Sequence, residues 1–344
     1  MFKKATLRFL DFLREEYKII IFFIIFYLVI TFPVPYYVFT SGGITDLSQR
    51  FEIENGYKQT GSYNLSYVNQ LNGNVLTYFL SIVVPGYERV DVGNYQVNEN
   101  ESIEEMSIRD KLSLESANQN AVIIAYQKAG KEVKINGFNM YIMATYDLLD
   151  SSETIKIGDI LLKINDKEIK TEDDIVEFEN IVANSEYDSY LTLELSRNGD
   201  VYTTEVKVNN YENRKVLGLM FFLDYDYEVD PKIEFKFGSG ESGSSAGLMT
   251  TLAIYDTLIE EDLTHGLKIA GTGTINGDGT VGAIGGVEFK LGGAVKGDAD
   301  IFFVPNEENY AEAIKIKEEK NYDIEIVGID TFDDAINYLK NIKE

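Results

Sequence analysis

A glycine- and serine-rich run, Gly238 to Gly247, has the residue types and spacing of a site that stabilises negative charge. Before it, Ile233–Phe237 alternates like a strand, and apolar residues from Leu248 to Ile259 recur at helical spacing. The run is therefore predicted to be a strand-to-helix turn. Backbone N–H groups at the start of a helix favour a bound anion or a developing oxyanion.

Several functions fit such a turn, and the simplest is a change of chain direction. A phosphate-binding loop needs Gly-x-x-x-x-Gly-Lys-Ser/Thr, but Ser244 stands where the lysine must be. A nucleophile elbow, Gly-x-Ser-x-Gly, matches from Gly243 to Gly247. The single histidine, His265, lies at the end of the next helix, where it could hardly fold back onto Ser245 as the base of an α/β-hydrolase.

A serine–lysine dyad is the third chemistry, and Lys290 is its candidate base. An ordinary lysine has a pKa of about 10.4 and cannot accept a proton at neutral pH. Lys290 follows Val287 and Phe289 and precedes Leu291 and Ala294. Burial among such residues would lower its pKa towards the roughly 7–8 that a base requires. The alternative is a solvated lysine on a helix.

Four motifs follow one another along the chain: Gly243-Ser244-Ser245-Ala246-Gly247, Thr272-Gly273-Thr274-Ile275, Gly279-x-Val281 and Ile284-Gly285-Gly286-x-x-x-Lys290. Together they resemble the proteolytic domain of Lon proteases. The resemblance implies that Ser245 is the nucleophile, that Lys290 is the base and that Thr272 hydrogen-bonds to the lysine. Backbone amides around Gly243 and Ser245 are expected to form the oxyanion hole. Ser244 replaces the proline that is usual in that family.

Composition excludes several other classes. The 344 residues contain no cysteine and one histidine, which rules out disulfides, thiolate metal sites and histidine-based zinc sites. A net charge of −26 makes nucleic acid a poor partner. No metal or cofactor is predicted. Hydrolysis is expected to be ATP-independent because no phosphate-binding lysine motif is present.

The N-terminal segment is strongly apolar. Counted from Tyr17 to Val38, it is long enough to span a bilayer. Residues 1–18 contain five basic and three acidic side chains, so the positive-inside rule leaves residues 1–16 in the cytoplasm. The prediction is a single-pass anchor (17–38) in a bacterial cell membrane, with the catalytic domain extracytoplasmic. A cleaved signal peptide is the alternative.

The middle of the chain divides into two parts. Residues 39–130 are a connecting region in which Gly61–Val68 alternates like a strand and Ser102–Lys128 looks helical; only a packing or spacer role is expected there. Residues 131–213 form a small β-rich module with a hairpin turn at Asn198-Gly199.

The β-rich module resembles a PDZ domain, because Gly158-Asp159-Ile160-Leu161 is followed by Ile164-Asn165-Asp166-Lys167. PDZ domains bind an extended peptide by adding it to a sheet edge. By position, the loop and strand from Gly137 through Met140 to Ile142 are expected to receive that peptide. A purely structural β-module is the alternative.

Strands alternate with helices over residues 214–344. The predicted fold is a multi-domain α+β chain with one transmembrane helix, a PDZ-like module and a Lon-type α/β proteolytic domain. This arrangement resembles bacterial membrane-anchored, PDZ-containing Lon-like serine proteases. It implies an endopeptidase that cleaves extracytoplasmic peptides or proteins, and it allows an oligomer. An inactive, anchored peptide-binding scaffold is the competing hypothesis.

Overall fold

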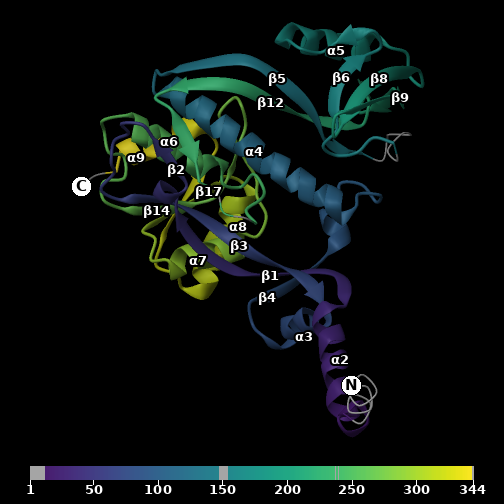
Figure 1. The fold of residues 1–344 in the computed structure, drawn as a ribbon. Helices are drawn as coiled ribbons and strands as arrows, with labels where there is room; N and C mark the ends of the chain where they lie inside the picture. Colours follow the sequence, from purple (N-terminus) through teal and green to yellow (C-terminus); the bar gives the residue numbers. More distant parts are fainter. Residues whose placement is uncertain (1–11, 147–153, 237, 239, 343–344) are drawn as a thin grey trace, which may run out of the picture. The chain divides into compact units, whose positions relative to one another are not determined.

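The structure, a computed structural model, describes residues 12–146, 154–236, 238 and 240–342. The chain forms two compact units (Figure 1). Of the described residues, the smaller unit holds those up to Ser41 and Asn69–Tyr95, and the larger unit holds Gly42–Val68 and those from Gln96 onwards. Strands β1 (Pro33–Asp46) and β3 (Ser62–Asn74) contribute residues to both.

The smaller unit contains two apolar helices and a strand pair. The helices are α2 (Tyr17–Thr31) and α3 (Val75–Val83), and neither contains a buried residue. Strand β4 (Tyr87–Asp91) pairs antiparallel with β1 over Tyr36–Thr40 and leads into the 3₁₀ turn η2 (Val92–Tyr95).

The predicted transmembrane helix is wrong, and so is the fold class that included it. In the part of the chain that the structure describes, no helix is both long enough and apolar enough to cross a membrane. Helix α2 has 15 residues, which span about 22 Å at 1.5 Å per residue, against a hydrocarbon core of about 30 Å. Pro33 disfavours helical backbone at Phe32, and β1 begins there. The extracytoplasmic location of the catalytic domain was inferred from this segment. It stays a prediction that no transmembrane helix supports in the described part of the chain.

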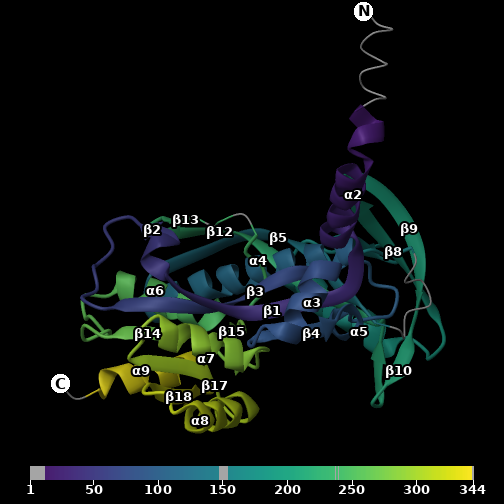
Figure 2. The ribbon, with the colours of Figure 1, turned by 90° about the horizontal axis from the view of Figure 1, so that it is seen from below.

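The central sheet of the larger unit has the strand order β18-β17-β14-β3-β1. Strand β3 is followed along this order by β14 (Lys268–Gly271), β17 (Ile301–Pro305) and β18 (Glu325–Ile329), all parallel to it. Figure 2 shows β1 and β3 running side by side. The predicted strand Gly61–Val68 is confirmed, and it pairs with β14, which lies about 200 residues later in the chain.

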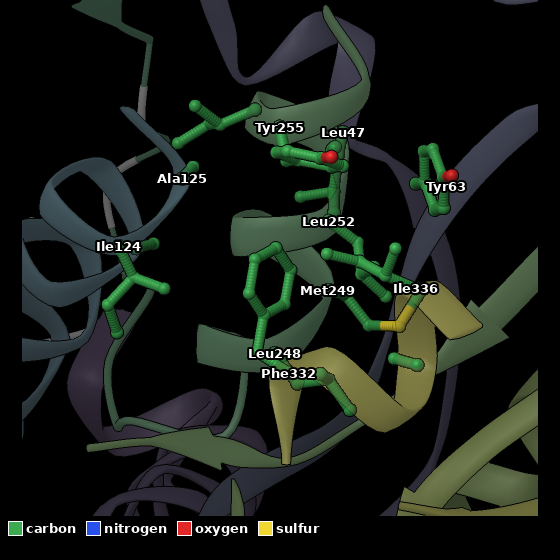
Figure 3. Packing of buried hydrophobic residues seen from close by; sticks show 14 of the residues in the cluster. Leu47, Tyr63, Ile124, Ala125, Leu248, Met249, Leu252, Tyr255, Phe332 and Ile336 are labelled. Carbon is green, nitrogen blue, oxygen red and sulfur yellow. The ribbon is translucent and has the colours of Figure 1, made fainter. Parts of the chain in front are cut away.

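Helices cover both faces of this sheet. Successive side chains of a strand point to opposite faces, so neighbouring apolar residues of one strand pack against different helices. Phe303 packs with α6 (Gly247–Leu258) and α9 (Phe332–Lys340), and part of this core is drawn in Figure 3. Its neighbour Phe302 packs with α7 (Val287–Lys296) and α8 (Glu308–Lys320). The sheet is thus the middle layer of three.

A long helix, α4 (Ile103–Lys128), lies against α6 (Figure 1). Ser102 and Glu105 close its N-terminus with a capping box. Ile124 and Ala125 near its C-terminus join the core around α6, whereas Leu112 in its first half packs on Phe222. The predicted helix Ser102–Lys128 is confirmed, and it contributes to the core of the larger unit.

The β-rich module forms a second sheet. Its strand order is β12 (Leu219–Asp230), β5 (Glu132–Thr145), β6 (Ile160–Ile164), β8 (Tyr190–Arg197) and β9 (Asp200–Lys207), and α5 (Glu172–Asn184) packs on it. The hairpin predicted at Asn198-Gly199 is confirmed, since both residues have positive φ. The short elements are η1 (Leu47–Gln49), β2 (Phe51–Ile53), β7 (Lys167–Glu168), β10 (Asn209–Tyr211), β11 (Arg214–Val216), β13 (Ile233–Phe235), β15 (Thr274–Ile275) and β16 (Val281–Gly282).

Candidate active site

The glycine- and serine-rich run is a turn that leads from β13 into α6, as its pattern predicts; Phe237 and Ser239 lie outside the described residues. Ser245 is partly exposed, and the helix begins two residues later. A Cβ at Gly247 would lie 2.8 Å from the backbone nitrogen of Ile275. Only glycine therefore lets the start of α6 approach β15 this closely.

Thr272 contacts the nucleophile candidate, Ser245, at the backbone carbonyl of the serine. The carbonyl oxygen of Ser245 accepts hydrogen bonds from Gly273 N–H at 2.9 Å and from Thr272 Oγ1 at 3.2 Å. Thr272 is fully buried where β14 ends. These two bonds fix the serine backbone against the end of the sheet.

Lys290 is the fourth residue of α7, whose N-cap is the left-handed Gly286. Its side chain is 6% exposed, and Nζ donates to Thr272 Oγ1 at 3.2 Å. Burial lowers the pKa of the Lys290 amine to about 8. A lysine with such a pKa is neutral in about one molecule in ten at pH 7, far more often than an ordinary lysine, and a general base needs this neutral form.

The three candidate residues are connected by one chain of hydrogen bonds. Lys290 Nζ donates to Thr272 Oγ1, and the same hydroxyl donates to the carbonyl of Ser245. Among the hydrogen bonds of the described residues, none joins Ser245 Oγ directly to Lys290 Nζ. The neighbouring Ser244 has no bond to Thr272, and its carbonyl accepts the Gly247 N–H. Only Ser245 of the two serines is tied to the lysine.

The two predicted oxyanion-hole donors differ in whether the N–H group already has a hydrogen-bond acceptor. The Gly243 N–H donates to the carbonyl of Asp110 in α4 at 2.9 Å, so it is not free. Within the described part of the chain, Ser245 N–H has no recorded acceptor. Sequence reasoning missed Asp110, because the contact is made by its backbone and carries no side-chain signature.

Charged residues near the turn have structural partners. Glu241 forms an ion pair with Arg50, and Asp278 accepts the N–H and hydroxyl of Thr280. Both carboxylates thus have structural partners in the turns that carry them. His265 Nε2 contacts the carbonyl of Leu339 at 3.1 Å and has no bond to Ser245. In the described region, no cluster of three or more His, Cys, Asp or Glu side chains could hold a metal ion.

The strand predicted to receive a peptide lies inside the second sheet. Gly137, Met140 and Ile142 belong to β5, which pairs with β12 along its length. Met140 also pairs with Leu161 of β6, and both Met140 and Ile142 are buried. The prediction of an open edge is therefore wrong at Met140, and a role for Gly137 stays a prediction. The two end strands of this sheet are β12 and β9.

Comparison with known proteins covers part of the chain. Residues 233–341 match the family described as the Lon protease (S16) C-terminal proteolytic domain. The Lon protease of Malacoplasma penetrans (strain HF-2) is 34% identical over 123 residues, and that of Mesomycoplasma hyopneumoniae (strain 232) is 32% identical over 124. The matches cover 33% and 35% of this chain. The chain spans only 15% and 14% of these relatives.

Two solved structures are similar to about a quarter of the chain. They are PDZ domains of the SdrC-like proteins from Listeria monocytogenes and Listeria innocua, 14% and 8% identical, each with a TM-score of 0.22. They match 26% and 24% of this chain and 92% of each domain.

The segment that carries Ser245, Thr272 and Lys290 lies within the first of these matches. It is similar to the proteolytic domain of Lon proteases, and this similarity supports a serine peptidase domain in the chain.

Proposed function

We propose that this chain is an ATP-independent serine endopeptidase in which Ser245 is the nucleophile and Lys290 the general base. The observation that carries the proposal is the hydrogen-bonded chain from Lys290 through Thr272 to the backbone of Ser245. Burial favours the neutral amine of Lys290, at one end of this series of hydrogen bonds. The partly exposed serine stands at the other end, where a substrate can reach it.

The reaction requires one proton carrier. Neutral Lys290 takes the proton from Ser245 as Oγ attacks the peptide carbonyl, and then gives that proton to the leaving amine as the C–N bond breaks. A water molecule enters in place of the amine, and the same cycle hydrolyses the ester. Thr272 accepts one N–H of the lysine and so keeps the amine in place.

The oxyanion of each tetrahedral intermediate needs backbone donors. Ser245 N–H is one donor. Gly243 N–H becomes the second by exchanging its Asp110 acceptor for the substrate oxygen. This exchange fits the turn, since Gly243 has a φ of 85° and its missing side chain lets the backbone rotate.

No nucleotide takes part in these steps. The glycine run at Gly238–Gly243 lacks the lysine that a phosphate-binding loop places next, because Ser244 occupies that position. Protein or peptide substrates follow from the chemistry of the site.

The test is hydrolysis of casein or a fluorogenic peptide library by the full chain without nucleotide. Ser245→Ala should abolish cleavage, and Ser244→Ala, the matched control one residue away, should retain most of it. The reverse pattern would place the nucleophile at Ser244. Binding of peptides without any cleavage by the wild type would favour the inactive-scaffold hypothesis.

A further inference from the structure

We propose that Ser66 is a positioning residue for the base: its hydroxyl fixes the backbone of Lys290 while Thr272 fixes the amine. The proposal rests on the function given above for Lys290. It assigns a role at the catalytic centre to a residue outside the segment matched at 233–341.

Ser66 is fully buried in β3, and its Oγ donates to the carbonyl oxygen of Lys290 at 2.5 Å. A buried hydroxyl left without a partner is costly, so this bond is a firm part of the core. The two residues are 224 positions apart in the chain. Nothing in the sequence around Ser66 points to such a contact.

Strand register explains why Ser66 and Thr272 reach the same lysine. β3 and β14 are parallel neighbours, with Asn64 opposite Ala270 and Leu65 opposite Gly271. Ser66 is the next residue of β3, and Thr272 directly follows the end of β14. Residues at equal level on neighbouring strands point to the same face, and here that face carries α7.

Helix α7 needs such a tether, because its own sequence holds it weakly. It has only 10 residues, and Gly292-Gly293 lies in its middle. Gly293 packs directly on the chain at Gly43, where an added Cβ would lie 3.0 Å from the Gly43 carbonyl oxygen. This contact sets the distance between helix and strand, whereas the directional Ser66 bond sets how far the helix can slide or turn.

Loss of the hydroxyl should therefore displace the amine rather than unfold the chain. A misplacement of about 1 Å in a reacting group can cost about 100-fold in rate. A lysine that is less firmly seated is also better hydrated, which returns its pKa towards the ordinary value. Burial alone accounts for the lowered pKa of Lys290, so no charged neighbour would offset this change.

The experiment measures the Lys290 amine directly, independently of catalysis. The full-length wild type, Ser66→Ala and Ser66→Thr are labelled with trace acetic anhydride from pH 6 to 11, and acetylation of the Lys290 peptide is read by mass spectrometry. Ser62→Ala is the matched control, since Ser62 lies on the same face of β3 and bonds to Asn64 instead. Peptide hydrolysis is measured in parallel.

We expect Ser66→Ala to raise the pKa of Lys290 by at least half a unit and to lower kcat about 10-fold or more with KM little changed. Ser66→Thr and Ser62→Ala should keep the wild-type titration. An unchanged Lys290 titration in Ser66→Ala overturns the proposal, as does an equal shift in Ser62→Ala, which would indicate general loosening. A titration shift in a chain that cleaves no peptide would refute the peptidase while leaving the positioning of Lys290 intact.

Discussion

Replacing the candidate base by methionine should make the protein more stable and inactive at once. Burial lowers the pKa of Lys290 from 10.5 to about 8, so the folded chain binds the proton less tightly than the unfolded chain. Each tenfold change in proton affinity is worth about 1.4 kcal/mol. Below pH 8 the buried charge therefore destabilises the folded state by about 3 kcal/mol.

Lys290→Met removes this cost but also the hydrogen bond to Thr272, whose net worth is about 1 kcal/mol. Methionine fills a similar volume, and the Thr272 hydroxyl keeps its bond to the Ser245 carbonyl. The expected net gain is about 2 kcal/mol in the free energy of unfolding at pH 7.

The pH dependence gives the sharper test of this reasoning. As pH rises through 8, the folded wild type loses the proton while the unfolded chain keeps it until about pH 10.5. The wild type is stabilised over that interval, so the advantage of Lys290→Met should be complete below pH 8 and vanish by about pH 10.5.

Urea denaturation of both chains at pH 7 and pH 10 measures the difference. Lys296→Met, on the exposed side of the same helix, is the control and should change little at either pH. A variant Lys290→Met that is no more stable than the wild type at pH 7 would falsify the idea that this lysine is strained by burial. The same gain at both pH values would mean that methionine merely packs better.

Three further outcomes follow from the same contacts. Peptide cleavage by the wild type should rise about tenfold per pH unit up to about pH 8 and then level off. Lys290→Arg should be inactive from pH 6 to 10, because arginine keeps its proton. Cleavage by Lys290→Arg would show that the lysine acts only as a charge. Thr272→Val should lower kcat about 10–100-fold, by analogy with residues that orient a reacting group, and unchanged kinetics would remove Thr272 from the site. Burial raises the pKa of Asp256, in α6, to about 7, so the folded wild type loses stability as pH rises from about 4 to 7. In urea denaturation, Asp256→Asn should be more stable than the wild type at pH 8 and equal to it at pH 4. A stability difference that does not depend on pH would contradict this.

Local signals predicted much of the fold. The helix expected over Ser102–Lys128 begins at Ile103, because the side chains of Ser102 and Glu105 satisfy its first amides. The Asn198-Gly199 turn forms because both residues accept positive φ. Such features depend on a few neighbouring residues, and a pattern along the chain therefore contains them.

Errors arose where an outcome depended on distant residues or on more than hydropathy. The run from Tyr17 to Val38 is apolar apart from Lys18 and Thr31, but hydropathy does not report that Pro33 ends the helix and starts a strand. Met140 belongs to a convincing strand, yet only its pairing with β6 on one side and β12 on the other shows that the edge is closed.

In the candidate site too, local motifs predicted the identity of the residues, whereas their chemical state depends on distant parts of the chain. Spacing and resemblance named Ser245, Thr272 and Lys290, because each belongs to a short motif. The chemical state of the lysine is not a property of any motif, since it depends on what covers the amine. Strand β3, carrying Ser66, lies beside β14 and contacts α7 at Lys290 itself. A segment expected only to connect domains thus helps to seat the lysine and to form the core that buries it.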